Sequence, residues 1–254
     1  MKNSFERKIL FGLSVFLFIF TLLPIIAPIA AYLNLNFIAD PIYWIYQWFC
    51  HQRPWRSYHL FDYQLAMDAR MMLMFGSMAI ASLLIYIKNL KPLKPFTAVI
   101  FAVIFIIPLG MDGVIQAIAE MTSYGGSGLP FYESTNLMRS ITGTLFGIGV
   151  AFAMFPYLNS FNQFISPIIY IKPIIWTFVF SILFMCFIVF SWNISSKVYK
   201  PSHLLFDAKA RFPGYNYEVT TSAGHSTIER VFNVDDKKLY LERARHFEKK
   251  EYIE

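Results

Sequence analysis

The stretch PFTAVIFAVIFIIPLGMDGVIQAIA, residues 95–119, carries one charged side chain, Asp112, among twenty-five residues. A helix rises about 1.5 Å per residue, so a run of this length can cross a hydrocarbon core about 30 Å thick. Membrane-spanning segments are helical because a helix satisfies the backbone N–H and C=O groups internally. The stretch therefore predicts a transmembrane helix with a carboxylate toward its end.

Four more apolar runs have a comparable length, and 56% of the chain is hydrophobic, compared with about 45–50% in soluble proteins. These runs are residues 9–33, 71–87, 141–158 and 173–192. The first exceeds the apolar core of about 7–15 residues that is typical of a cleaved secretory signal, so we expect a retained helix, kinked near Pro24 and Pro28. The sequence thus predicts an all-α fold, a polytopic membrane helix bundle of about five transmembrane helices over residues 1–194.

Residues 195–254 are expected to form a small α+β extramembrane tail. The segments YNYEVTT and IERVFNV have the β-branched and aromatic content of strands, and DDKKLYLERARHFEKKEY has the charge distribution of a helix. About 60 residues bury too little surface to be comfortably stable alone, so we expect the tail to dock a protein partner or the membrane. The net charge of +6 is spread over the termini and short connections, which makes nucleic acid a poor partner.

Short basic segments predict the orientation of the chain. Lys2, Arg7 and Lys8 precede the first run, and KNLKPLK, residues 88–94, joins the second run to the third. Short loops rich in Lys and Arg stay in the cytoplasm, so we expect the N-terminus on the inner side of the cytoplasmic membrane. The connections then expected on the outer side are residues 34–70 and 120–139, together with the tail despite its many basic residues.

Polar clusters fall on that outer side. The first is the stretch FCHQRPWRSYHLFDYQLAMDARMM, residues 49–72, preceded by DPIYWIYQW, whose Trp and Tyr side chains favour a membrane interface. The second is the pair Asp112 and Gln116, which share a helix face because they are four residues apart. A carboxylate at the bilayer centre costs roughly 2.5–3.5 kcal/mol, and less near an edge, so Asp112 predicts a functional site.

The third cluster is ESTNLMRSITGTLFG, residues 133–147, which opens the fourth apolar run. A serine or threonine at its start can cap a helix, on which Asn136, Arg139 and Gly143 then follow along one stripe. Arg139 is the expected partner of Asp112. Gly143 and the glycine four residues later form a small-xxx-small pair that lets helix backbones approach closely.

These clusters are remote in sequence but share one side and one depth, which predicts a polar pocket at the membrane interface. We expect His51 or Asp112 to accept a proton in a catalytic role, and arginine forks to hold a phosphate or carboxylate headgroup. The residues expected to bind the substrate are Gln52, Arg53, Arg70, Gln116, Asn136 and Arg139. The alternative is that the buried polar residues only tie the bundle together. His59 and Asp62 are expected in a solvated loop.

Taken together, CHQRPWRSY, YQLAMDAR, MDGVIQ and ESTNLMRSITGTLFG resemble the domain of unknown function 2085 family, integral membrane proteins of bacteria and archaea. In that family the motifs run C-H-Q-x-P-x-R-S, C-A-R-C, D-G-x-x-Q and E-S-T-N-x-x-R-x-x-T-G. The resemblance covers about residues 48–150 in order, and it is specific because four separate motifs agree. The family label names no reaction, so the resemblance leaves the chemistry open.

The chain departs from this pattern where the family has C-A-R-C and the sequence reads DARM, residues 68–71. The thiols and imidazole of the family pattern would suit zinc or another soft metal. Of the family's three thiols at this face only Cys50 remains. The set left for a metal is Cys50, His51 and Asp68, which is chemically compatible with a zinc site that keeps an open position.

A looser likeness links the second and third clusters to the VanZ-like membrane proteins, which have D-E-x-x-Q, Arg and N-x-x-G elements at similar spacing. Gly113 replaces the acidic neighbour in that pattern. The likeness implies cell-envelope or lipid-linked substrates. We therefore expect a membrane protein that binds or processes a lipid-linked or anionic headgroup. The alternatives are a non-catalytic subunit of a membrane assembly, which the missing thiols favour, and a transporter.

Overall fold

The structure is a computed structural model, and it describes residues 2–50, 56–61, 63–124, 132, 134–159 and 163–195. Its α-helices are α1 (Lys2–Tyr32), α2 (Asn36–Tyr46), α3 (Ala69–Lys88), α4 (Pro95–Tyr124), α5 (Asn136–Met154) and α6 (Ile171–Ser195). The described chain also contains a hairpin, β1 (His59–Leu60) and β2 (Tyr63–Gln64), and two 3₁₀ turns, η2 (Phe155–Leu158) and η3 (Pro167–Tyr170). The strands and the helix expected in residues 196–254 lie outside the described residues.

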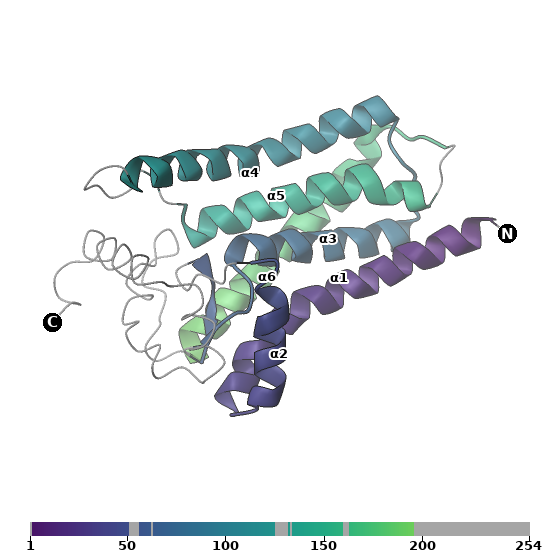
Figure 1. Cartoon of the computed structure of the whole chain (residues 1–254). Helices are drawn as coiled ribbons and strands as arrows, with labels where there is room; N and C mark the ends of the chain where they lie inside the picture. The colour runs from purple at the N-terminus through teal and green to yellow at the C-terminus, as the bar shows by residue number, and fades with distance from the viewer. Residues whose placement is uncertain are drawn as a thin grey trace. The chain divides into compact units, whose positions relative to one another are not determined.

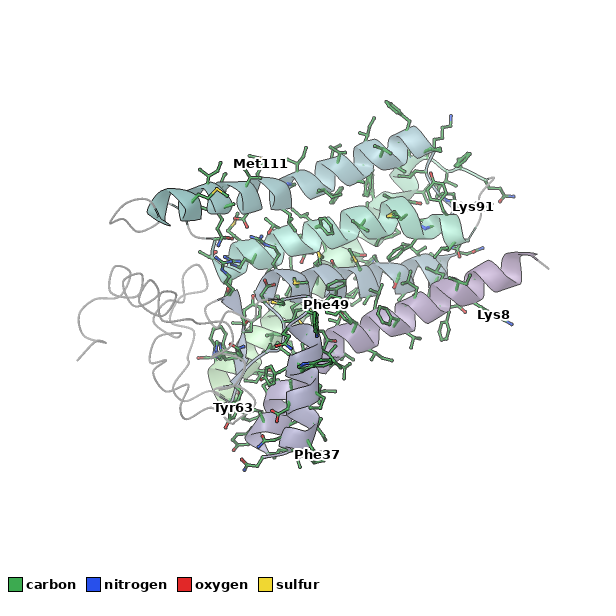
Figure 2. The ribbon with its side chains drawn as sticks, in the orientation of Figure 1. Lys8, Phe37, Phe49, Tyr63, Lys91 and Met111 are labelled. Atoms are coloured by element: carbon green, nitrogen blue, oxygen red, sulfur yellow. The ribbon has the colours of Figure 1, made fainter. Side chains whose placement is uncertain are left out.

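Five of these helices are long and apolar enough to cross a membrane, as the sequence predicts. The spans are Arg7–Tyr32, Ala69–Lys88, Pro95–Ala119, Asn136–Leu158 and Pro167–Ser195. The most apolar stretch of α5 is 56% buried, whereas that of α4 is only 11% buried. Apolar side chains such as Met111 project from the exposed surface of α4 (Figure 2). Apolar surface around a helix is typical of a membrane span, so the all-α membrane bundle is confirmed.

The chain falls into two compact units. Unit 1 consists of Met1–Leu22, Arg70–Gly113 and Arg139–Cys186. Unit 2 consists of Leu23–Ala69, Val114–Met138 and Phe187–Glu254, of which the described part ends at Ser195.

Glycines bring the helices of unit 1 together. In this unit α3, α4 and α5 run side by side (Figure 1). A Cβ atom built at Gly147 would overlap the Met74 carbonyl of α3. One built at Gly149 would lie 2.6 Å from the Cβ of Phe105 on α4. Only glycine allows such close approach, so the small-residue packing expected on α5 is confirmed.

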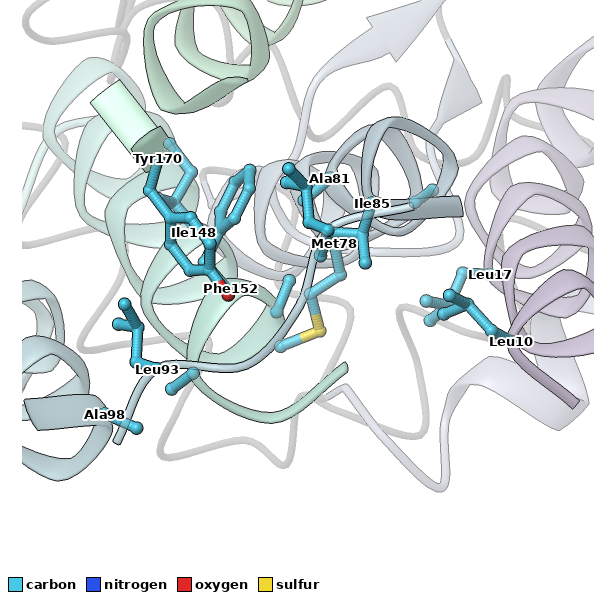
Figure 3. Packing of buried hydrophobic residues seen from close by; sticks show 14 residues of the cluster. Leu10, Leu17, Met78, Ala81, Ile85, Leu93, Ala98, Ile148, Phe152 and Tyr170 are labelled. Atoms are coloured by element: carbon cyan, nitrogen blue, oxygen red, sulfur yellow. The ribbon is translucent and has the colours of Figure 1, made fainter. Parts of the chain in front are cut away.

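The buried apolar core of unit 1 draws on α1, α3, α4, α5 and η3 (Figure 3), and partly buried residues of α6 pack against it. Tyr170 packs against Phe152 of α5, with ring centroids 5.5 Å apart. Met78 and Ile85 of α3 and Leu17 of α1 belong to the same cluster. Between helices in lipid, this kind of van der Waals packing replaces the hydrophobic driving force as the source of association.

Two helices end at an asparagine in the left-handed conformation. In α3, Asn89 has φ 48°, and the N–H groups of Asn89 and Leu90 donate to the carbonyls of Tyr86 and Ile85 (3.3 and 3.1 Å). This is a Schellman motif, in which asparagine tolerates the positive φ better than most residues. The same pattern ends α1, where Asn34 has φ 59°.

Prolines within α1 leave a carbonyl for another segment. The helix continues through Pro24 and Pro28. Because Pro28 has no N–H, the carbonyl of Pro24 has no donor within the helix. The N–H of Ala66 donates to that carbonyl across unit 2 (3.4 Å). The expected kink itself stays a prediction.

Unit 2 contains elements that the sequence analysis did not predict. The short helix α2 exposes Trp44 and buries Tyr43, whose hydroxyl donates to the Gln64 carbonyl of β2 (2.5 Å). Burial raises the pKa of Tyr43 above its usual value, and the nearby Tyr63 and Asp40 raise it further. The neutral phenol therefore ties α2 to the hairpin.

The hairpin corrects the expectation of a solvated loop at His59. β1 and β2 are antiparallel, with His59 opposite Gln64, and His59 is only 2% exposed. Its ring packs against Trp192 of α6, with centroids 5.2 Å apart. The prediction was wrong because the packing partner lies 133 residues further along the chain. Asp62 lies outside the described residues.

Candidate functional site

An ion pair joins two of the residues that the sequence marks as functional. Arg70 is the second residue of α3, Asp112 lies on α4, and both belong to unit 1. The Nη2 of Arg70 donates to Oδ2 of Asp112. The two side chains are 18% and 3% exposed. A buried carboxylate needs such a partner, because removing one member of a buried pair costs about 3–5 kcal/mol.

Two glycines frame Arg70. A Cβ atom built at Gly143 would overlap the Arg70 carbonyl oxygen, so α5 packs directly on the first turn of α3. A Cβ atom built at Gly113 would lie 3.7 Å from Nη1 of Arg70, which is ordinary van der Waals contact. The arginine backbone thus lies against α5, while its guanidinium lies beside α4 next to a residue without a side chain.

The guanidinium of Arg70 keeps donor capacity beyond its pair with Asp112. An arginine has five N–H donors in a fixed fork. The Nε of Arg70 is buried and has no hydrogen-bond partner among the described residues. Because the side chain is also partly exposed, the fork can take a further acceptor without losing Asp112.

Arg139 is a second buried guanidinium of unit 1, with only 2% of its surface exposed. It lies on α5 one helical turn before Gly143, and its carbonyl accepts the Thr142 hydroxyl (3.3 Å). The ion pair that the structure gives Asp112 is with Arg70, which the sequence analysis expected to bind substrate. A pairing of Arg139 with Asp112 stays a prediction.

Unit 2 joins the first and third polar clusters. Nδ2 of Asn136 donates to the Ser57 carbonyl at 3.5 Å, and both residues are buried. Thr135 caps α5, since its Oγ1 accepts the N–H of Met138 (3.1 Å), as expected of a serine or threonine at this start. Gln116 is 5% exposed on α4, one turn beyond Asp112.

The proposed metal ligands are only partly within the described chain. Cys50 is 5% exposed, and its N–H donates to the Tyr46 carbonyl at the end of α2 (2.9 Å). Asp68 is partly buried just before α3. The described side chains include no group of three or more His, Cys, Asp and Glu that could hold a metal ion. His51 lies outside them, so zinc at Cys50, His51 and Asp68 stays a prediction.

The structure therefore places the predicted site residues in two groups. It joins Arg70 with Asp112 in unit 1, and Asn136 with the Ser57 backbone in unit 2. Gln52 and Arg53 lie outside the described residues. The sequence analysis missed the role of Ser57, which acts through its backbone and leaves no side-chain signal. A single pocket lined by all the predicted residues stays a prediction.

Comparisons with known proteins agree with this assignment of a membrane protein. The family model described as "Predicted membrane protein (DUF2085)" matches residues 50–153. An uncharacterized protein of Methanocaldococcus jannaschii is 30% identical over 154 residues, which cover 58% of this chain and 85% of that protein. No solved structure matches the chain significantly. The looser likeness to VanZ-like proteins stays a prediction. With four motifs, a matching family model and a relative covered over most of its length, the chain belongs to the DUF2085 family of integral membrane proteins.

Proposed function

We propose that this membrane protein binds an anionic headgroup, a phosphate or carboxylate on a lipid or lipid-linked molecule, at Arg70. The observation that supports the proposal is the environment of the three guanidinium nitrogens. Nη2 is held by Asp112, Nε is buried with no described hydrogen-bond partner, and Nη1 lies beside Gly113. Arginine recognises phosphate and carboxylate through such forks, with the planar geometry that lysine lacks.

Asp112 has a positioning role in this proposal. Its carboxylate fixes the guanidinium at the start of α3, so the free donors need no reorganisation when an anion arrives. A reaction on the bound headgroup would need a proton acceptor, for which Asp112 and His51 are the candidates from the sequence. Binding is the part of the function that the described geometry supports.

A second candidate function is purely structural, and the burial of the ion pair favours it. Asp112 is only 3% exposed, so its pair with Arg70 can serve to tie α3 to α4 in a subunit of a larger membrane assembly. The two candidates differ in one respect. A structural pair needs both charges, whereas headgroup binding also needs room for an anion beside Nη1 of Arg70.

Lipid retention can be measured by native mass spectrometry of the detergent-purified protein. We expect Gly113→Leu to lose the bound headgroup, because the new side chain fills the space beside Nη1. Gly110→Leu is the matched control, since a Cβ atom there meets nothing within 4 Å. Arg70→Lys should lose retention as well, because it keeps the charge but not the fork.

The outcomes separate the two candidates. Loss of the headgroup in Gly113→Leu and Arg70→Lys, with Gly110→Leu unchanged, supports binding. If Gly113→Leu retains lipid as the wild type does, the binding proposal fails. A fall in the unfolding temperature of Arg70→Lys, with lipid retention unchanged, would leave the structural role.

A further inference from the structure

One end of unit 1 is strongly basic. The cations there come from α1, from the end of α3, from the loop before α4 and from the start of α6: Arg7, Lys8, Lys88, Lys91, Lys94 and Lys172. Lys91 is partly exposed and the others are exposed. Among the described side chains of unit 1 the acidic one is Asp112, which is paired with Arg70. The charged side chains that the structure describes at this end are therefore all cationic, and they outnumber Glu6, the acidic neighbour of Arg7 in the sequence.

Direct contacts place these cations together. The guanidinium of Arg7 lies over the ring of Tyr86, 5.0 Å from its centroid, which brings the start of α1 to the end of α3. The hydroxyl of Tyr170 donates to the Lys91 carbonyl (2.6 Å), which brings the start of α6 to the same loop. Figure 2 shows Lys8, near the start of α1, and Lys91, in the loop after α3, toward the same end of unit 1.

The loop that carries the lysines, residues 89–94, is held by hydrogen bonds along its length. Nδ2 of Asn159 donates to the Leu90 carbonyl (2.9 Å), and the Tyr157 hydroxyl donates to the Leu93 carbonyl (2.8 Å). The N–H of Ile165 donates to the Pro92 carbonyl (3.1 Å). The backbone of Lys91 and Lys94 is thus held in place before a ligand binds. This lowers the conformational entropy cost of binding at the loop.

We propose that this basic end is a binding surface for anionic phospholipids, whose phosphates neutralise the cations. The cations lie at the ends of membrane-spanning helices, which is the level of lipid headgroups. Clustered cations in excess over acidic residues match the phosphates of anionic lipids. This surface is separate from Arg70 and Asp112 and does not depend on the function proposed for them.

The test uses the full-length protein in mixed micelles with phosphatidylglycerol or phosphatidylcholine, followed by native mass spectrometry. We expect the wild type to retain phosphatidylglycerol preferentially. Each lysine near a membrane surface contributes about 1 kcal/mol, a factor of about five, so Lys91→Gln with Lys94→Gln should weaken retention about 25-fold. Lys172→Gln, on a different element, should weaken it about fivefold.

The matched control is Lys91→Arg with Lys94→Arg, which keeps both charges and should retain lipid within about twofold of the wild type. Inorganic phosphate at the same concentration as the lipid should not displace it, because it lacks anchorage in the bilayer. Equal retention in the wild type and the double glutamine variant would overturn the proposal. So would an equal loss in the arginine variant, or displacement by free phosphate.

Discussion

Replacing Gly143 with alanine tests the close contact of α5 with the backbone of Arg70, the residue whose side chain pairs with Asp112. A Cβ atom at this position would overlap the carbonyl oxygen of Arg70, and it would also lie 3.3 Å from the Arg70 Cα. The atoms of Arg70 that the new methyl group meets belong to its backbone, so no side chain can rotate away. The helix α5 must therefore move away from α3. Overpacking of this kind costs about 1–3 kcal/mol. We expect Gly143→Ala to be destabilised by that amount and to weaken the pair of Arg70 with Asp112.

The assay is thermal unfolding in detergent, with Gly113→Ala and Gly110→Ala as matched controls on α4. At Gly113 the new methyl group would lie in ordinary contact, and at Gly110 it meets nothing within 4 Å. Both controls should unfold at or above the wild-type temperature, because alanine is a better helix former than glycine by up to about 1 kcal/mol. If Gly143→Ala unfolds at the same temperature as these controls, the close approach of α5 to Arg70 is refuted.

Two buried polar side chains and one pKa give the remaining predictions. Asn159→Ala removes the donor that serves the carbonyls of Ile85 and Leu90, which should lower stability by about 1–3 kcal/mol; an unchanged unfolding temperature would contradict this. Tyr43→Phe removes the hydroxyl that donates to the Gln64 carbonyl and should cost about 1 kcal/mol, measured by the same unfolding assay. Because burial raises the pKa of Tyr43, its contribution to stability is complete below about pH 10, the pKa of an unfolded phenol, and falls as the pH rises above that value. A series of unfolding temperatures from pH 8 to about pH 11 should therefore slope downward more for the wild type than for Tyr43→Phe, and parallel slopes would show that the phenol is not buried.

Length and composition were sufficient to predict the spans, because a membrane helix needs only a long apolar run. They were not sufficient for α2, which contains Pro41 and covers eleven residues. A helix this short is marginal alone and depends on tertiary packing, here on the burial of Tyr43 and Tyr46. The partner that Tyr43 contacts, Gln64, lies outside any local window, so no periodicity in the helix itself reveals it.

The candidate site, too, depends on tertiary contacts that local sequence patterns do not reveal. Helical spacing shows that Arg139 and Gly143 share a face of α5, but not which side chain of another helix reaches Asp112. The connections expected on the outer side, residues 34–70 and 120–139, contain four arginines, and the ion pair that the structure gives Asp112 is with Arg70. This pair joins the start of α3 to α4, a contact between helices that spacing along one helix does not show.

The contacts of Arg70 bear on the two thiols of the family pattern that this chain lacks. The family motif C-A-R-C flanks its arginine with two thiols, and this chain keeps Arg70 while Asp68 and Met71 replace the thiols. Arg70 contacts Asp112 of the D-G-x-x-Q motif and Gly143 of the T-G element, so three motifs meet at one residue. None of these contacts needs a thiol or a metal. The arrangement around Arg70 can therefore persist in a chain that has lost the cysteines, which is why the headgroup proposal rests on the arginine.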